Sequence, residues 1–326
     1  MAKLDAKDIK LLAELDKDAR QSNNQIGKKI GLSKEVVKYR IDKLMNEKVI
    51  VRFDTIINYF KLGIMKFKLY LRLTNVNKEK IEEIAQYLKN NKKSEWVVTC
   101  TGRWDIIVGF LVHNPNEFDD EMQTILSKYP KYIQEKAVTT TLHLVHHERG
   151  FLKKDKSTSL VYHTLKDKKE EIDDNDEEIL KILANHGRIT ITEIAEKLKI
   201  TPRIIQYKIK NLEKKGIILA YKAHLNPKSM DRIFCKALIY LTNLNHEKLN
   251  EFINYTSSIP DVVWPQKVMG NWDFEIDCEV ISYDRFQDIL LDLKEKFPDI
   301  IKNYEFCIVS KEFKLDLFPE CYPAFD

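Results

Sequence analysis

Apolar residues along this chain follow two different periods, and the two periods alternate twice. Ile179, Leu180 and Leu183 recur at the three- and four-residue spacing of an amphipathic helix, and similar spacing occurs near the start of the chain. Residues 66–73 instead alternate polar and apolar side chains, which is typical of a strand with one buried face. The pattern predicts a helical segment, then a mixed segment of helices and strands, and then a second round of both.

The two rounds are copies of one unit. Asp5 corresponds to Asp173, a difference of 168 in residue number, and the same difference holds without a gap throughout both segments. The pairs with this offset include Asp8 and Asp176, Arg20 and Arg188, Ile26 and Ile194, Tyr39 and Tyr207, Leu44 and Leu212, Trp96 and Trp264, Gly102 and Gly270, Trp104 and Trp272, and Pro130 and Pro298. A constant offset of this kind indicates a tandem duplication.

Each copy begins with the pattern of a helix-turn-helix headpiece. In the second copy, a short helix at residues 191–198 is followed by Thr201, a favourable N-cap, and Pro202, which suits the first position of a helix. The helix that starts there is expected to reach about Lys214, and Ser33 is the matching N-cap in the first copy. Two short helices, a tight turn and a third helix form the helix-turn-helix pattern.

The outward face of the third helix in each headpiece is polar and mostly basic. Recognition helices place their N-terminal residues against base edges and their basic residues against phosphates. The residues expected to contact double-stranded DNA are Lys34, Glu35, Lys38, Tyr39, Lys43, Arg203, Gln206, Tyr207 and Lys210. A plain three-helix bundle with a lysine-coated surface is the alternative, but the capped turn occurs twice at matching positions, which favours DNA binding.

Beyond each headpiece the order of elements is β-α-β-β-α-β, the ferredoxin-like arrangement. In the first copy the expected elements are a strand at 66–73, a helix at 77–90, strands at 96–101 and 105–112, a helix at 116–129 and a strand at 133–145. In the second copy they are expected at 234–242, 246–255, 262–269, 273–280, 284–297 and 302–313. Short strands at 49–53 and 217–221 would form a wing after each recognition helix.

The sequence therefore predicts an α+β protein with two repeats, each a winged helix-turn-helix headpiece plus a ferredoxin-like βαββαβ sensor domain. The expected domains are residues 1–63 (first headpiece), 64–150 (first sensor domain), 151–171 (linker), 172–231 (second headpiece) and 232–326 (second sensor domain). The linker is rich in lysine and weakly patterned, with a strand considered at Leu160–Tyr162.

This combination resembles the Lrp/AsnC family, the leucine-responsive regulators of bacteria and archaea. The residues that carry the resemblance are Asp173-x-x-Asp176, Ile194-Ala195-x-x-Leu198, Thr201, Lys214-Lys215-Gly216-Ile217-Ile218, and the loops Thr101-Gly102-Arg103-Trp104-Asp105 and Met269-Gly270-Asn271-Trp272-Asp273. The resemblance covers nearly the whole chain, twice. It implies a transcriptional regulator that binds DNA, is not an enzyme and needs no cofactor.

The resemblance also implies an effector site. Sensor domains of the family pair sheet to sheet and often bind an amino acid near the glycine loop, which by position transfers to Gly102, Asp105, Gly270 and Asp273. The alternative is that each glycine serves a tight turn and each aspartate accepts local N–H bonds. Relatives have one copy per chain and form homodimers, whereas here the pair could form within one chain, with further homo-oligomers or swapping between chains left open.

Two further departures concern particular residues. Lys48 precedes Val-Ile where most family members have a glycine, so the turn after the first recognition helix is expected to be altered. In the second copy, Glu275, Asp277 and Glu279 share one face of a strand. Carboxylates are costly to bury unless they are neutralised. We expect an exposed face here; neutralisation by Lys66, Lys68 and Arg72, or a Mg²⁺ or Ca²⁺ site, are the alternatives.

Charge and composition change this picture only in part. Residues 1–150 carry 27 basic and 20 acidic side chains, whereas residues 172–326 carry 21 and 26, so the first half suits a polyanion better. Opposite signs would also favour pairing of the two halves. The charged N-terminus, the lack of a long apolar run and five scattered cysteines predict a cytoplasmic protein with reduced thiols.

Two other functional classes remain open. Siroheme decarboxylases use the same architecture, sometimes with two units fused, and need His and Arg in the second sensor strand. Here that strand, at 96–101 and 262–267, contains neither, and the chain shows no phosphate-binding loop, Cys-x-x-Cys pair or His-Glu-x-x-His motif, so neither a catalytic nor a metal site is predicted. The other class is a protein-binding module in which one or both headpieces have lost DNA binding.

Overall fold

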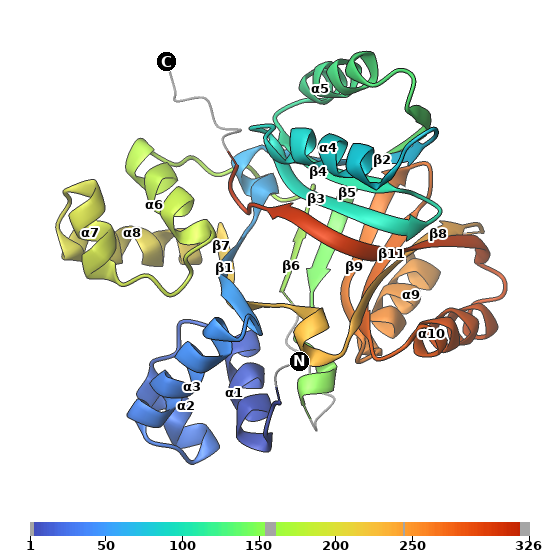
Figure 1. The fold of residues 1–326 in the computed structure, drawn as a ribbon. Coiled ribbons are helices and arrows are strands. Elements are labelled where there is room, and N and C mark those ends of the chain that lie inside the picture. The colour runs from blue at the N-terminus through green and yellow to red at the C-terminus, as the bar shows by residue number, and fades with distance from the viewer. Residues whose placement is uncertain (1–2, 154–160, 244, 320–326) are drawn as a thin grey trace.

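The protein consists of two headpieces on one side and a strand-rich body on the other (Figure 1). The structure, a computed structural model, describes residues 3–153, 161–243 and 245–319. Four helices cover the body, and a two-stranded ribbon joins the headpieces. Within the described residues, no helix is both long enough and apolar enough to cross a membrane.

Each headpiece is a bundle of three short helices. The helices are α1 (Ala6–Lys17), α2 (Asn23–Ile30) and α3 (Lys34–Asn46) in the first copy, and α6 (Asp174–Ala184), α7 (Ile191–Leu198) and α8 (Pro202–Lys214) in the second. Ser33 caps α3 by accepting a hydrogen bond from the Val36 backbone N–H, whereas Thr201 occupies the N-cap of α8 without a side-chain cap bond. The helix-turn-helix prediction is confirmed in both copies.

The paired aspartates at the start of each headpiece hold the recognition helix in place. Asp5 and Asp8 form a capping box at α1, and Arg40 of α3 binds both carboxylates at 2.8 and 2.6 Å. The second copy repeats this arrangement with Lys208 of α8 and the corresponding aspartates. The Asp-x-x-Asp motif is therefore a structural device that caps one helix and orients another.

A ribbon of two antiparallel strands joins the headpieces. It pairs β1 (Ile50–Ile57) with β7 (Ile218–Leu225), and these strands continue beyond the expected 49–53 and 217–221 because each supplies the other's hydrogen bonds. Arg20 donates to the Gly187 carbonyl at 3.0 Å. Its counterpart Arg188 donates to the carbonyl of Ala19, the position equivalent to Gly187. The two headpieces therefore contact each other reciprocally, as the halves of a two-fold symmetric dimer would.

The turn into the ribbon is the same in both copies. Lys48 has a φ of 56°, close to the 66° of Gly216 at the matching position. The expectation of an altered turn is wrong: the lysine adopts the left-handed conformation that glycine supplies in the other copy, at an energetic cost. Short 3-10 helices, Tyr59–Leu62 and Pro227–Met230, then lead into the sensor domains.

Both sensor domains have the predicted β-α-β-β-α-β order. The first contains β2 (Met65–Leu73), α4 (Lys78–Lys89), β3 (Ser94–Gly102), β4 (Ile106–Val112), α5 (Pro115–Lys128) and β5 (Ile133–His146). The second contains β8 (Ile233–Leu241), α9 (His246–Ser258), β9 (Val262–Gly270), β10 (Phe274–Val280), α10 (Tyr283–Lys296) and β11 (Ile301–Leu315).

The two sensor sheets join edge to edge at two seams. Strand β3 pairs with β11, and β5 pairs with β9, so the strand order runs β2-β4-β3-β11-β8-β10-β9-β5 and returns to β2. We call this ring the barrel. Its interior is a shared core in which Tyr70 stacks edge-on against Trp272 at 4.6 Å and Trp104 lies 6.3 Å from Trp272. The pairing of the two copies thus takes place within one chain.

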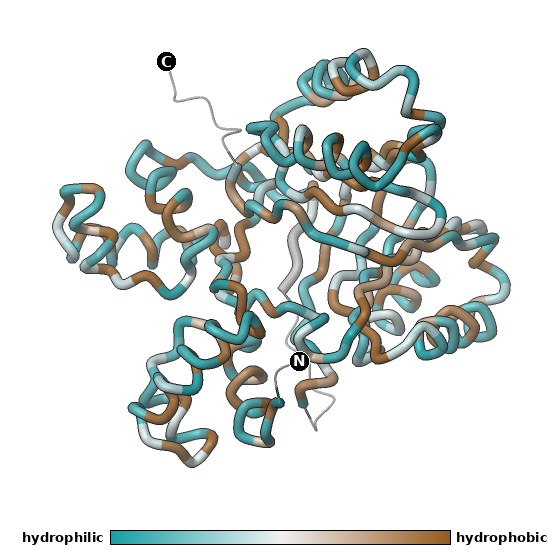
Figure 2. Tube along the Cα trace, viewed as in Figure 1, coloured by the Kyte–Doolittle hydropathy of each residue, from teal (hydrophilic) through white to brown (hydrophobic). Residues whose placement is uncertain are grey.

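The covering helices pack with one apolar face each on the barrel. Hydrophobic and hydrophilic residues alternate along them in Figure 2, as an amphipathic helix requires. Separate clusters of apolar residues lie under α4 and α5 and under α9 and α10. A third cluster combines both headpieces with the ribbon, so the headpieces share one core.

The linker contributes a strand of its own. After the 3-10 turn Gly150–Leu152, strand β6 (Val161–Thr164) pairs antiparallel with the end of β5. The strand considered at Leu160–Tyr162 thus corresponds in part to β6, while Leu160 lies outside the described residues. Four of the cysteines are buried free thiols, and Cys321 lies outside the described residues.

Candidate nucleic-acid interface and barrel cavity

The predicted DNA-contacting residues lie on the outward faces of α3 and α8. Tyr39 and Tyr207 have 68% and 70% of their surface exposed, although tyrosine usually buries part of its ring. Of the other residues predicted to contact DNA, only Lys43 is half-buried; the exposed ones are Lys34, Glu35, Lys38, Arg203, Gln206 and Lys210. The inward faces are fixed by buried aliphatic residues, so these outward side chains are free of the core.

Two exposed lysines of α3 are paired with acids on the same helix. Lys38 Nζ lies 2.9 Å from the Asp42 carboxylate, and Lys34 Nζ lies 3.7 Å from that of Glu35. For Arg203 and Lys210 of α8, no ion pair forms with any described residue. Exposed pairs of this kind are weak, so a phosphate can compete for the lysines. Both helices lie on the same side of the molecule, away from the helices that cover the barrel (Figure 1).

The glycine loops predicted as an effector site lie at the two barrel seams. A Cβ added to Gly102 would lie 2.7 Å from the Phe306 carbonyl oxygen, and one added to Gly270 would lie 2.1 Å from that of Val138. Both glycines also have positive φ angles, 121° and 147°. Because a side chain would collide with the neighbouring strand, each glycine permits close approach of the two sheets.

The aspartates of the same loops accept hydrogen bonds from the backbone. Asp105 accepts from the Leu73 N–H at 2.7 Å, and Asp273 accepts from the Leu241 N–H at 2.8 Å. Each aspartate thereby ties its loop to the end of the adjacent strand. All four residues predicted to bind an effector thus take part in holding the loops or the sheets together in this chain.

The acidic face of β10 points into the barrel, and the expectation of an exposed face is wrong. Glu275 is fully buried and lies 2.5 Å from Lys68 Nζ and 3.0 Å from Lys236 Nζ. Lys236 also binds Asp277 at 2.6 Å. Burial alone would raise the pKa of Glu275, but the two ammonium groups hold it well below the usual range. The lysines thus supply the positive charge that neutralises this face.

Of the three cations considered as partners, only Lys68 neutralises this face. Lys66 pairs instead with Glu95 at 2.8 Å, and Arg72 donates to the Gly102 carbonyl at 2.7 Å. The sequence analysis did not identify Lys236 as a partner of these carboxylates. Its position offered a signal, because Lys236 is the counterpart of Lys68 at the offset of 168 and its strand, β8, pairs with β10. Within the described residues, no group of three His, Cys, Asp or Glu could hold a metal ion.

Arg149 connects the third carboxylate to a headpiece. Its guanidinium donates two hydrogen bonds to Glu279, at 2.8 and 2.9 Å, and one to Asp16 of α1 at 2.6 Å. Nearby, Lys222 of the ribbon donates to the backbone carbonyls of Asp16 and His147, both at 3.1 Å. This buried network ties α1 and the ribbon to the barrel, and sequence analysis did not identify it because Arg149 has no counterpart in the other copy.

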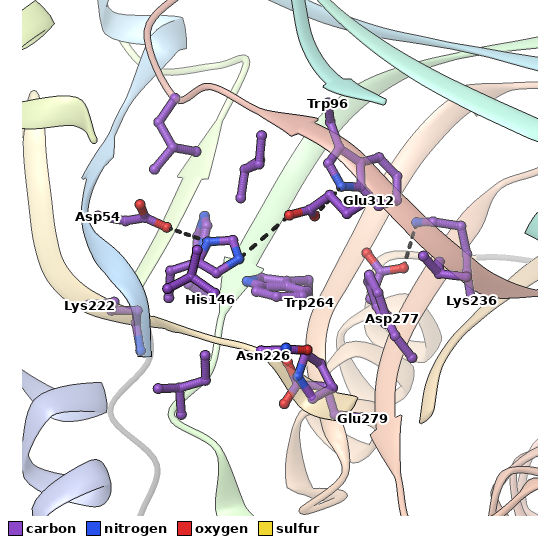
Figure 3. A pocket seen from close by; sticks show the side chains of 18 of the residues that line it. Asp54, Trp96, His146, Lys222, Asn226, Lys236, Trp264, Asp277, Glu279 and Glu312 are labelled. Atoms are coloured by element: carbon purple, nitrogen blue, oxygen red, sulfur yellow. Dashed lines mark hydrogen bonds and ion pairs between the residues drawn. The ribbon is translucent and has the colours of Figure 1, made fainter. Parts of the chain in front are cut away.

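A cavity of about 470 Å³ lies between the ribbon and the barrel. Figure 3 shows His146 and Trp264 in its middle, with Asp54 and Lys222 on the ribbon side and Trp96 on the barrel side. His224 bridges the ribbon and β11, because its Nδ1 lies 3.0 Å from Asp54 and its Nε2 lies 3.6 Å from Glu312. The cavity is large enough for a small molecule.

Comparisons with known proteins agree with this architecture. An AsnC-type helix-turn-helix domain matches residues 4–45, and a winged helix-turn-helix DNA-binding domain matches residues 172–218. The leucine-responsive regulatory protein of Rhizobium meliloti is 32% identical over 125 residues, which cover 79% of that protein and 37% of this chain. The chain belongs to the Lrp/AsnC family. An uncharacterised HTH-type transcriptional regulator of Pyrococcus furiosus is 26% identical over 146 residues, 94% of its length and 44% of this chain.

Each of these Lrp/AsnC relatives spans less than half of the chain, which fits one copy of the duplicated unit. Over the whole length, the fold is similar to the crystal structure of a siroheme decarboxylase, with a TM-score of 0.65 and 12% identity, covering 96% of this chain and 94% of that one. At this identity the likeness concerns the fold alone. Two fused headpiece-and-sensor units are therefore an architecture that occurs elsewhere.

Proposed function

We propose that this Lrp/AsnC protein is a DNA-binding transcriptional regulator, without enzymatic activity, in which one chain supplies both halves of the DNA-binding dimer. One observation carries the proposal: the reciprocal arginine contacts and the ribbon hold two helix-turn-helix headpieces together, with both recognition helices exposed. Helices held in this way contact two half-sites of one duplex.

A binding measurement over a range of salt concentrations tests this proposal. We expect the full chain to bind duplex DNA with an affinity that falls steeply with salt, because each phosphate contact contributes about one unit to the slope of log K against log salt concentration. Tyr39→Ala plus Tyr207→Ala should weaken specific binding, while Lys89→Ala at the end of α4 is the matched control. Absence of salt-dependent binding would instead favour a protein-binding module.

We also propose that a small molecule, such as an amino acid, regulates DNA binding. The family resemblance supports the loops of Gly102, Asp105, Gly270 and Asp273 as its site. The aspartates accept backbone hydrogen bonds and the glycines lie against the neighbouring strand, so a ligand would bind over the seam without displacing those contacts. The barrel cavity is a second location, and its walls include the ribbon.

Ligand-induced stabilisation distinguishes these two locations. A ligand at a hundred times its Kd adds about 2.7 kcal/mol to stability, which a thermal shift with each common amino acid would detect. Loss of the shift in Asp105→Asn plus Asp273→Asn would place the ligand at the loops. Loss in Trp264→Phe would place it in the cavity. If no amino acid shifts the melting temperature, the effector proposal in its amino-acid form is wrong.

A siroheme decarboxylase-like enzyme is the second candidate, since the fold likeness to that enzyme spans the whole chain. The cavity contains His146 and Arg149, although neither lies in the second sensor strand where the resemblance would require them. An absorbance titration with siroheme separates the two candidates. A tight coloured complex would support the enzyme, and an unchanged siroheme spectrum would support the regulator.

A further inference from the structure

The two recognition helices have the same scaffold. Their buried positions are occupied by similar aliphatic residues, such as Ile41 and Ile209, and the last buried residue of each helix is a leucine. Both helices are anchored to the first helix of their headpiece, one through Arg40 and the other through Lys208. Equivalent positions on α3 and α8, which differ by 168 in number, therefore face DNA in equivalent ways.

The outward faces of the same helices are chemically different. Glu35 corresponds to Arg203, and Asp42 corresponds to Lys210, so the sign of the charge is reversed at two exposed positions. Apart from the shared tyrosine, the other outward positions also differ: Lys34 and Pro202, Val36 and Ile204, Lys38 and Gln206, and Lys43 and Asn211. Apart from this tyrosine, the identical residues of the two helices thus lie at positions that build the helix.

Reversed charges at equivalent positions select different bases. Near the N-terminus of a recognition helix, an arginine pairs best with guanine, whose major-groove edge offers two acceptors. A glutamate can only accept, so it pairs with the amino group of cytosine. Glu35 and Arg203 stand at the second position of their helices, the region that contacts base edges in helix-turn-helix proteins.

The charge of the two faces differs as well. On α3 the lysines at positions 34 and 38 are paired with Glu35 and Asp42, which lowers the positive charge available to phosphates. On α8 the outward positive charges, Arg203 and Lys210, have no acidic partner among the described residues. The second headpiece is therefore at least as well equipped for DNA as the first, although its overall composition is less basic.

The frame that holds the helices is, by contrast, nearly symmetric. Antiparallel pairing of β1 with β7 and the reciprocal contacts of Arg20 and Arg188 relate the headpieces by an approximate two-fold axis. A symmetric frame sets two half-sites in inverted orientation at a fixed spacing. In a homodimer this arrangement selects a palindrome, because both half-sites meet the same side chains.

We propose that this chain recognises an asymmetric operator with two different half-sites, one read by α3 and one by α8, and that it binds this operator in a single orientation. This inference rests on the proposed DNA binding. Glu35, Asp42, Arg203 and Lys210 determine the difference between the half-sites. Exchange of one half-site for a copy of the other should weaken binding roughly 10- to 100-fold, because each unfavourable base pair contributes a separate loss.

Selection from a random duplex library with the full chain tests this proposal. The wild-type chain should enrich a non-palindromic site. The decisive variant gives α3 four of the outward residues of α8, through three exposed substitutions, Glu35→Arg, Lys38→Gln and Asp42→Lys, and one at a half-buried position, Lys43→Asn. This variant should enrich an inverted repeat of the α8 half-site. The converse variant of α8, Arg203→Glu plus Lys210→Asp, should move the selected site toward an inverted repeat of the α3 half-site.

The outcomes separate this proposal from the one on which it rests. If the wild-type chain enriches a palindrome, the operator is symmetric and only this inference fails. If the α3 variant leaves a non-palindromic site unchanged, the outward residues of α3 do not read a half-site, and again only this inference fails. If the wild-type chain binds no DNA even at low salt, both proposals fail. An unchanged melting temperature shows that the variants fold, and Lys89→Ala, on a surface away from both headpieces, should enrich the wild-type site.

Discussion

Substitution of Glu275 is the most direct test of whether the buried charges stabilise the barrel. Its carboxylate accepts hydrogen bonds from Lys68, Lys236, Tyr70, Thr139 and the Trp272 indole, at distances from 2.5 to 3.1 Å. Glu275→Gln keeps the shape of the side chain but removes its charge. Two ammonium groups then remain in a buried site, and the Asp277 carboxylate contacts one of them, that of Lys236.

We expect Glu275→Gln to lower the free energy of unfolding by about 3–5 kcal/mol, the usual cost of removing one partner from a buried ion pair. The combined variant Lys68→Met plus Glu275→Gln should recover a large part of this loss, because Lys236 keeps Asp277 at 2.6 Å and no excess charge remains. Urea unfolding, followed by the fluorescence of the four tryptophans, which include Trp104 and Trp272 in the barrel core, measures both values. A loss below about 1 kcal/mol, or no recovery in the combined variant, would refute this account of the cluster.

Three further predictions concern the backbone and pH. Gly270→Ala should destabilise the barrel by about 3 kcal/mol or more, and by more than Gly102→Ala, because its new methyl group would lie closer to the opposite strand; urea unfolding would rank the two. Lys48→Gly should raise the melting temperature through relief of up to about 1 kcal/mol of backbone strain, and an unchanged temperature would argue against strain there. Burial, with a smaller contribution from Lys222, lowers the pKa of His147 from 6.5 to about 4. The unfolded chain therefore takes up a proton that the folded chain resists, so stability should fall by up to about 3 kcal/mol as the pH drops from 6.5 to 4; His147→Leu should flatten this dependence.

The order of elements could be predicted because it depends on local periods. The alternation in residues 66–73 and the caps at Ser33 and Thr201 are properties of short segments, and the structure places a strand and two helix starts there. The extra length of β1 could not be predicted, since residues 54–57 are strand only because β7 pairs with them. Long-range pairing of this kind leaves no local signal.

The burial of the acidic strand shows the same limit. Glu275 by itself favours an exposed face, and burial becomes tolerable because Lys236 and Lys68, the latter 207 positions away, both contact its carboxylate. The duplication offered a partial clue. Lys68 and Lys236 occupy equivalent positions, and the strand that carries Lys236, β8, pairs with the acidic strand β10. Arg149 stands outside the repeat, so its link between α1 and the barrel required the structure.

The two barrel seams have a consequence for how this regulator coexists with its relatives. Each sheet uses both of its edge strands to pair with the other sheet of the same chain, and the acidic strand of one copy requires the lysine of the other. Covalent linkage keeps the partners at an effective concentration in the millimolar range, whatever the abundance of the protein. Dilution therefore does not separate the halves, and a single-copy family member would not readily replace either of them. The pairing of these two halves is therefore fixed when the chain is synthesised.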